Sequence, residues 1–324
     1  MTASRSAAID RTSSLGRRGL LAVAGALPMV SAVGARRAAA QPGGVTDLMP
    51  AFWRVYDSGK GASVEARAGA LIADYFQPHL EVYRGTGIGR INLGRWLPVF
   101  DGLADEARRL SASVPGAWRA QIERFARHLP DAATDTPVAI LVSFLNFDAA
   151  VRLWRGRPSL FIGLDGVARF HGPGADLGAL FDHERFHLYH HQVNPSLILQ
   201  GGDTLWLGIW KEGLAVHASA ALNPAASRLQ ALLGDRGLAE APPDLLRRVA
   251  AELPPVLHAT DGQTRARYLS YGYRGDIPAR SGYLLGLAIV ERVARGRGLA
   301  ELARIPAPDI EAIVRAQVAA LAAG

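Results

Sequence analysis

The chain of 324 residues contains no cysteine. This absence excludes disulfide bonds, thiol nucleophiles, iron–sulfur clusters and zinc sites with cysteine ligands. A hydrophobic content of 49% is nevertheless enough to bury a sizeable core without covalent cross-links. Any zinc site in this chain must therefore be built from histidine and carboxylate side chains.

Lysine is almost as scarce, because only Lys60 and Lys211 are present and nearly all of the basic charge is arginine. The net charge of +7 suggests a nucleic-acid partner, but most of it lies near the N-terminus. Residues 1–40 contain six arginines and one aspartate, so the rest of the chain has 30 basic and 28 acidic side chains. A body this close to neutral has no electrostatic footprint for DNA or RNA, and we expect no nucleic-acid partner.

Long apolar runs are also rare. The candidate run, Gly19 to Ala35, follows Arg17-Arg18 and precedes Ala38-Ala39-Ala40. This order is typical of an export signal, and the paired arginines resemble the twin-arginine signal of proteins that are exported folded. An ordinary secretory signal and an uncleaved anchor are the alternatives. We expect residues 1–40 to be removed as a signal, a periplasmic or extracellular location, and no membrane span in the mature chain.

The remaining chain divides into two parts by its pattern. Residues 41–135 are expected to form an N-terminal helical region, with apolar residues at helical spacing in 45–55, 63–77, 96–110 and 118–129. Residues 136–324 are expected to form the catalytic region. It begins with three segments rich in Val, Ile, Leu and Phe that indicate strands, at 136–147, 159–163 and 167–170. A turn is expected at Asp165-Gly166, between the second and the third. Helices are then expected at 176–193, 205–222, 244–252, 281–295 and 309–322. The predicted fold class is α+β, mostly helical, with a small β-sheet packed on the helix of 176–193.

Residues 183–187 are His-Glu-Arg-Phe-His, an H-E-x-x-H motif inside an expected helix. Residues four apart lie on one helical face, so His183 and His187 can bind the same ion. Glu184 lies beside them, where it can take a proton from a metal-bound water. Two imidazoles, a carboxylate and a water suit Zn²⁺. The motif predicts one zinc ion per chain; the alternative is a polar helix face with two surface histidines.

The residues after the motif exclude one class of zinc enzymes. A metzincin continues as x-x-G-x-x-H, but His190 and Val193 occupy the glycine and histidine positions here. His190 and His191 could be further ligands, but the helix diverges from a single ion over two turns. We expect these two histidines to surround the ligands or to lie at the surface.

Glu212 is the candidate third ligand, which is the gluzincin arrangement. It lies 25 residues after His187, on the next expected helix. Its neighbours Gly213 and Ala215 are small, which would let this helix pack closely against the motif helix. The alternative is a solvated glutamate paired with Lys211.

Three motifs occur in a fixed order along the chain. The first is His183 to His187, the second is Lys211-Glu212-Gly213-Leu214-Ala215, and the third is Pro278-x-Arg280-x-Gly282-Tyr283-x-x-Gly286. Over residues 136–297 this set resembles the bacterial family of predicted zinc-dependent proteases typified by YjaZ. The resemblance implies a gluzincin-type zinc metallopeptidase fold. It does not cover the N-terminal helical region or the export signal, and the His190-His191 pair departs from it.

The third motif also has a physical interpretation. A tetrahedral intermediate needs a donor aimed at its oxyanion beside the zinc. Tyr283 and Arg280 could supply this donor, and His217, five residues after Glu212, competes for the same role. The alternatives are that Tyr283 packs in the core and that Arg280 pairs with a carboxylate.

The predicted function is that of an exported zinc metallopeptidase that acts on a peptide or protein. Zinc would activate a water, and Glu184 would take its proton and pass it to the leaving amine. An extended peptide could pair with the strand expected at 159–163 or 167–170. The alternatives are a zinc-binding protein of this fold with a binding or assembly role, and a zinc hydrolase that acts on a non-peptide bond.

Overall fold

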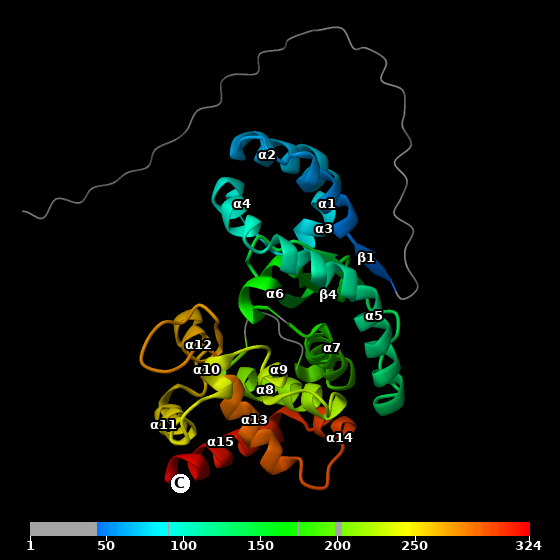
Figure 1. Cartoon of the computed structure of the whole chain (residues 1–324). Coiled ribbons are helices and arrows are strands. Elements are labelled where there is room, and N and C mark those ends of the chain that lie inside the picture. Colours follow the sequence, from blue (N-terminus) through cyan, green and yellow to red (C-terminus); the bar gives the residue numbers. More distant parts are fainter. Residues whose placement is uncertain (1–43, 90, 174, 198–202) are drawn as a thin grey trace, which may run out of the picture. The chain divides into compact units, whose positions relative to one another are not determined.

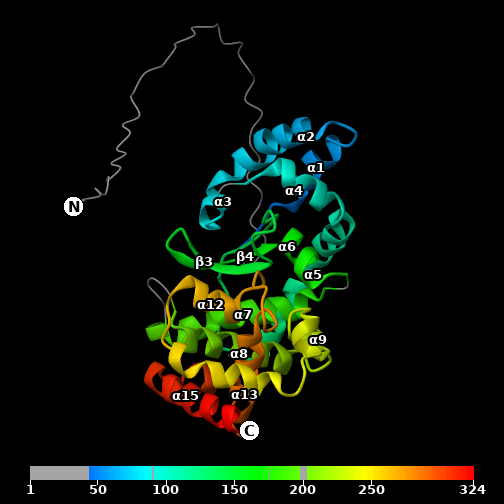
Figure 2. The ribbon, with the colours of Figure 1, turned by 90° about the vertical axis from the view of Figure 1, so that its left-hand side faces the viewer.

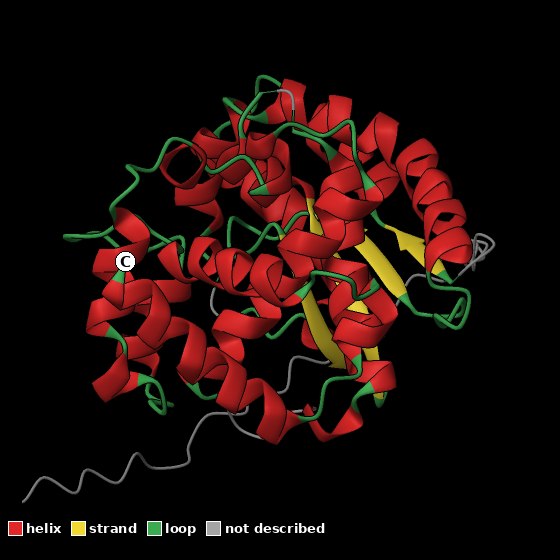
Figure 3. Ribbon diagram, turned by 90° about the horizontal axis from the view of Figure 1, so that it is seen from below, coloured by secondary structure: helices red, strands yellow, loops and turns green. Residues whose placement is uncertain are grey.

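The computed structural model describes residues 44–89, 91–173, 175–197 and 203–324 (Figure 1). The predicted export signal, residues 1–40, lies outside them. The described chain is α+β and mostly helical, as the sequence predicts, with one four-stranded sheet. Figure 3 shows this sheet beside a much larger set of helices. None of the helices in these ranges has the length and apolar character needed to cross a membrane.

The secondary structure follows in chain order. The strands are β1 (Val45–Asp47), β2 (Val138–Leu141), β3 (Ala149–Trp154) and β4 (Arg157–Gly163). The helices before the sheet are α1 (Met49–Ser58), α2 (Val64–Ala70), α3 (Leu80–Gly85), α4 (Leu93–Asp101) and α5 (Ala104–His128). Those after it are α6 (Leu164–His171), α7 (Leu177–Val193), α8 (Leu205–Leu222), α9 (Arg228–Ala231), α10 (Arg236–Ala239), α11 (Leu245–Glu252), α12 (Gly262–Leu269), α13 (Ser281–Val293), α14 (Leu299–Ala303) and α15 (Ala307–Ala323).

The sheet has the strand order β1-β2-β4-β3. The β1–β2 and β2–β4 pairs are parallel, and β3 pairs antiparallel with β4. A two-residue turn, Arg155-Gly156, joins β3 to β4, and both residues have positive φ (52° and 73°) as a tight hairpin turn requires. The sequence predictions missed both β1 and β3. In this order β4 is an inner strand, and β3 lies at one end of the sheet.

Two of the predicted strands differ from the structure near the bend that follows β2: the first is shorter than expected and the second is helical. The strand expected at 136–147 ends at Leu141, because Phe144 and Leu145 take left-handed φ values of 54° and 60°. The buried Asp165 carboxylate stabilises this bend by accepting hydrogen bonds from the backbone N–H groups of Ser143 (2.5 Å) and Leu145 (2.8 Å). Asp165, which was expected in a turn, is the second residue of helix α6.

Residues 167–170, expected as a strand, belong to α6. Gly166, which was expected in a turn, lies in α6 where the backbone of Phe147 leaves no room for a side chain. A Cβ atom at this position would lie 1.9 Å from the Phe147 carbonyl oxygen. Helix α6 therefore packs directly against the bend that follows β2.

Two separate helical segments were expected at 96–110 and 118–129. The structure has one continuous 25-residue helix, α5, that covers the end of the first segment and most of the second and contains Pro115. A proline inside a helix costs about 3 kcal/mol. Pro115 is on the exposed side, whereas Leu110, Val114, Trp118 and Phe125 are buried along one stripe. Packing of this unbroken stripe holds the helix together across the proline.

Helix α7, which bears the H-E-x-x-H motif, lies between two hydrophobic cores. Leu180 and Phe181 belong to the core formed with the sheet and the preceding helices. Phe186 and Tyr189 belong to the core formed by the C-terminal helices. Figure 2 shows α7 between β4 and α8, and both β3 and β4 contact it. A helix buried on so many sides is held firmly in place, which suits a ligand-bearing element.

The small residues around Glu212 serve a different contact from the one expected. Gly213 packs on Gly286 of α13, not on the motif helix: a Cβ on Gly213 would lie 2.0 Å from the Gly286 carbonyl carbon. A Cβ on Gly286 would lie 2.1 Å from the carbonyl oxygen of Ile209. The glycines of the second and third motifs therefore let α8 and α13 touch backbone to backbone.

We expect Gly286→Ala to lower the free energy of unfolding by about 3 kcal/mol, because its methyl group would overlap backbone atoms that cannot move independently. Gly116→Ala is the control, since a Cβ at this position in α5 meets nothing within 4 Å. That change removes a flexible residue from a helix and is expected to raise stability by up to about 1 kcal/mol. Urea denaturation measures both. Equal stability of Gly286→Ala and the wild type would show that the two helices are not in close contact.

Candidate metal centre

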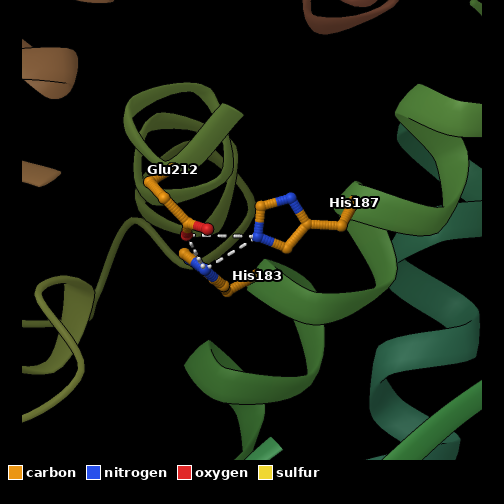
Figure 4. Close-up of side chains that lie close together, drawn as sticks. All are labelled: His183, His187 and Glu212. Atoms are coloured by element: carbon orange, nitrogen blue, oxygen red, sulfur yellow. Dashed lines mark hydrogen bonds and ion pairs between the residues drawn. The ribbon is translucent and has the colours of Figure 1, made fainter. Parts of the chain in front are cut away.

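Three predicted ligands meet between α7 and α8. His183 and His187 project from successive turns of α7, and Glu212 projects toward them from α8 (Figure 4). The two Nε2 atoms are 3.2 Å apart, and the Glu212 Oε2 atom is 3.3 Å from each of them. This set of histidine and acidic donors is the one group of its kind among the described residues that could hold a metal ion.

The spacing of these donor atoms fits zinc. Bonds of about 2.0–2.1 Å to a tetrahedral ion place neighbouring donors about 3.3–3.4 Å apart. The three separations in this site agree with that value, and two imidazoles with one carboxylate leave a fourth position open. The buried Nδ1 atom of His183 has no hydrogen-bond partner among the described residues, so its tautomer is not fixed by a neighbour. An ion bound at Nε2 would fix it.

Electrostatics favours a carboxylate at the centre of the site. Burial alone would raise the pKa of Glu212, but the positive charge of His187 and hydrogen bonds from both histidines outweigh burial and lower it well below its usual range. Burial lowers the pKa of His183, which favours the neutral imidazole that a metal needs. Glu212 is therefore negatively charged at this partly buried position, where its side chain is 23% exposed.

Side-chain contacts fix the two helices relative to each other. The carboxylate of Asp176 caps α7 by accepting a hydrogen bond from the Gly178 N–H (2.8 Å). Buried Asp182 accepts from Arg124 of α5 (2.7 Å) and from Asn223 at the end of α8 (2.6 Å). One aspartate thereby joins three helices one residue before the first ligand.

Glu184 lies beside the three ligands and is 9% exposed. Within the described ranges its carboxylate accepts no hydrogen bond from the protein. Burial raises its pKa to about 8, and the negative charges of Asp148 and Glu212 contribute, while His187 opposes the shift. A buried carboxyl group of raised pKa in a cavity is a typical proton acceptor and donor.

A cavity of about 330 Å³ opens onto this site. Glu184, His187, Glu212 and Tyr283 line it. Residues that the sequence analysis did not single out also line it, namely Asp148, Asp203, Tyr271 and the first four residues of β3, Ala149 to Arg152. The sequence analysis missed these residues because it did not predict β3. The first residues of this strand lie beside the motif helix α7.

Of the candidate oxyanion donors, Tyr283 and Arg280 both line the cavity. The Tyr283 ring lies parallel to that of His183, with centroids 6.2 Å apart. Burial raises the pKa of Tyr283 well above its usual value, so its hydroxyl keeps its proton and can donate it in a hydrogen bond.

Arg280 is placed differently from its predicted role. Its side chain is 1% exposed, and its Nη2 atom donates to Asp235 (3.0 Å). Its guanidinium lies 3.5 Å from the centroid of the Tyr271 ring, and its backbone has a left-handed φ of 56°. A buried, paired arginine held against Tyr271 shapes one wall of the cavity, as the alternative interpretation of this residue expected.

The remaining histidines separate into different environments. His217 is half-buried on α8, about 140° around the helix from Glu212, and does not line the cavity among the described residues. His190 is buried beside Phe186, with ring centroids 6.5 Å apart. His191 lines the cavity. None of these three joins the group of donor atoms at the site.

A second buried charge pair adjoins the site. The Asp148 carboxylate contacts His171 Nε2 at 2.8 Å and accepts a hydrogen bond from the Tyr271 hydroxyl at 3.2 Å. Burial would raise the pKa of Asp148, but the hydrogen bond and charge of His171 outweigh burial and lower it to about 2. The pair thus joins the start of β3 to α6 and to the loop before α13.

Asp148 gives a specific pH dependence. Its pKa is about 2 when folded and 3.8 in the reference state, so its contribution is complete above pH 3.8 and is lost as the pH falls through 2. The shift corresponds to about 2 kcal/mol. In urea denaturation of chain freed of metal, we expect Asp148→Asn to remove that part of the acid-induced loss of stability. Asp105→Asn, at an exposed position of α5, is the control. An unchanged slope in Asp148→Asn would contradict this assignment.

Comparison with known proteins adds no relative: no family model, no curated protein and no solved structure matches this chain. The resemblance to the YjaZ-typified proteases therefore stays a prediction from three motifs.

Proposed function

We propose that this chain is an exported zinc-dependent metallopeptidase of the gluzincin kind. The observation that carries the proposal is the set of three donor atoms, 3.2–3.3 Å apart, with the Glu184 carboxyl group beside them in one cavity. The export signal expected at residues 1–40 gives the location, periplasmic or extracellular.

His183, His187 and Glu212 would hold the ion. Zinc, when bound, supplies a Lewis acid and lowers the pKa of a water to about 7. Glu184 would accept the proton of the attacking water at its carboxylate and then donate it to the leaving amine. The Tyr283 hydroxyl would donate a hydrogen bond to the oxygen that becomes negative. Arg280 would orient the neighbouring Tyr271 by stacking on it in the wall of the cavity.

The peptide would lie along β3. The strands that the sequence analysis offered for this purpose are unsuitable, since β4 pairs with β2 on one side and β3 on the other, and residues 167–170 are helical. In contrast, β3 is the end strand, and Ala149 to Arg152 line the cavity of the site. An extended peptide can add to such an edge through backbone hydrogen bonds.

The proposal is tested by hydrolysis. The zinc-loaded chain is incubated with a peptide pool of random sequence, and new termini are identified by mass spectrometry with and without a chelator. We expect cleavage that stops when zinc is removed and returns when it is restored. Intact peptides after long incubation with a fully loaded chain would count against peptidase activity.

A further inference from the structure

Arg152 is the unusual residue of the edge strand. It lies on β3 in the lining of the site cavity, and its side chain is exposed. Its Nη1 atom donates to the carbonyl of its own neighbour Val151 at 3.0 Å. No carboxylate of the described residues forms an ion pair with Arg152, although its positive charge acts on the Glu184 carboxyl group in the same cavity. The other arginines of the same hairpin do form ion pairs, since Arg155 contacts Glu81 and Arg157 contacts Asp135.

The other cations of this cavity are neutralised. Lys211 Nζ is 3.1 Å from Asp203, and Arg280 pairs with Asp235. The carboxylates are also committed: Asp148 pairs with His171, and Glu212 with the two ligand histidines. Arg152 therefore lacks an ion pair within the described residues, and its guanidinium is available to an anionic group on the strand where the peptide would lie.

A second cavity, of about 690 Å³, adjoins the first, and Asp148 and Tyr271 line both. Arg169 and Arg274 line it, and both are exposed. Arg274 donates to the backbone carbonyls of Tyr271 and Tyr273 (2.7 and 2.8 Å). Neither arginine contacts a carboxylate within the described ranges. Two adjoining cavities therefore present three arginines without anionic partners.

We propose that the substrate is an acidic peptide, whose Asp or Glu side chains are bound by Arg152 beside the scissile bond and by Arg169 and Arg274 further along. This inference rests on the proposed function only in that the bound peptide is also cleaved, because binding of an acidic peptide does not require hydrolysis. Guanidinium groups form paired, charge-assisted hydrogen bonds with carboxylates. The free edge of β3 favours a polypeptide over a nucleic acid, since it supplies backbone hydrogen bonds in an extended register.

The test measures binding in the zinc-loaded Glu184→Gln variant, so that no peptide is consumed. Three fluorescein-labelled peptides are identical except for Glu, Gln or Lys at alternate positions. Fluorescence anisotropy at low salt should give the tightest binding for the Glu peptide, by about tenfold or more over the Gln peptide. The preference should weaken as salt is added.

Arg152→Gln in the same background should remove about tenfold in affinity for the Glu peptide and leave the Gln peptide unchanged. Arg155→Gln is the matched control, since it removes the same charge from the same hairpin at an exposed position outside both cavities. Equal affinity for the Glu and Gln peptides, equal effects of the two variants, or no binding of any peptide would each overturn the inference. So would displacement of the Glu peptide by an oligothymidylate.

The outcome separates this inference from the proposed function. Charge-selective binding that depends on Arg152, with no hydrolysis by the chain with Glu184 intact, would support the acidic ligand and refute the peptidase. Hydrolysis of the random pool without preference for acidic residues would support the peptidase and refute the acidic substrate.

Discussion

His187→Ala should leave a folded chain that no longer binds zinc. The wild type is expected to contain about one zinc per chain after purification with the ion, because three donor atoms already stand at the spacing of a tetrahedral site. Loss of a residue that merely supports a ligand costs about 10–100-fold in affinity, so loss of the ligand should cost at least about a hundredfold. Metal content is measured by atomic emission after gel filtration.

Zinc binding should also appear as stability. A ligand at about a thousand times its dissociation constant adds about 4 kcal/mol to the free energy of unfolding, so zinc should raise the melting temperature of the wild type but not of His187→Ala. His217→Ala is the matched control, because His217 lies on the same helix as Glu212 and outside the cavity lining. A folded wild type that takes up no zinc, or a His187→Ala variant that keeps it, would remove the basis of the proposed function.

The grouping of His183, His187 and Glu212 was predictable because most of it depends on local geometry. Helices α7 and α8 have the expected extents, since Asn194-Pro195 and Asn223-Pro224 end them and apolar residues fill both. Within α7, the four-residue spacing of His183 and His187 places both on one face whatever the rest of the chain does. The approach of Glu212 to these histidines depends on how α7 and α8 pack. It could still be predicted, because Glu212 is a carboxylate on the next helix along the chain.

The rest of the site depends on contacts between distant segments. Strand β3 was missed because it is short, carries Arg152 in the middle, and turns at Arg155-Gly156, a pair that is not a common hairpin signal. Asp148, which bonds Tyr271 from 123 residues away, gave no sign in the sequence. Periodicity indicates which face of an element is apolar, but not which element covers it.

The glycines of the motifs illustrate the same limit of sequence patterns. Gly213 was noted as a small residue and Gly286 only as part of the third motif, yet the two glycines contact each other between α8 and α13. Arg280 was considered for the oxyanion, and its pairing with Asp235, 45 residues earlier in the chain, was not foreseen in the motif. A motif shows that a residue type is needed at a position, whereas only the packed structure shows whether chemistry or packing needs it.

Glu184→Gln should abolish peptide hydrolysis while zinc stays bound. The change keeps the size of the side chain but removes its capacity to accept a proton, and general-base catalysis contributes about 10²–10⁴-fold to rate. Burial gives Glu184 a pKa of about 8. A divalent cation on His183 and His187 would favour its carboxylate form, the form that accepts a proton. The measurement is the cleavage rate of the peptide pool, with zinc content determined on the same samples.

Glu291→Gln is the control, since Glu291 is exposed on α13 and the same chemical change there should leave the rate unaltered. The pair of variants also separates the three readings of the metal centre. Loss of cleavage with zinc retained supports the peptidase, because a ligand or a folding residue would lose both. Intact biological function in Glu184→Gln would favour a zinc-binding protein that acts without peptide hydrolysis. Loss of biological function without any peptide cleavage by the wild type would instead favour a zinc hydrolase that acts on another kind of bond, since Glu184 would still be needed to move the proton.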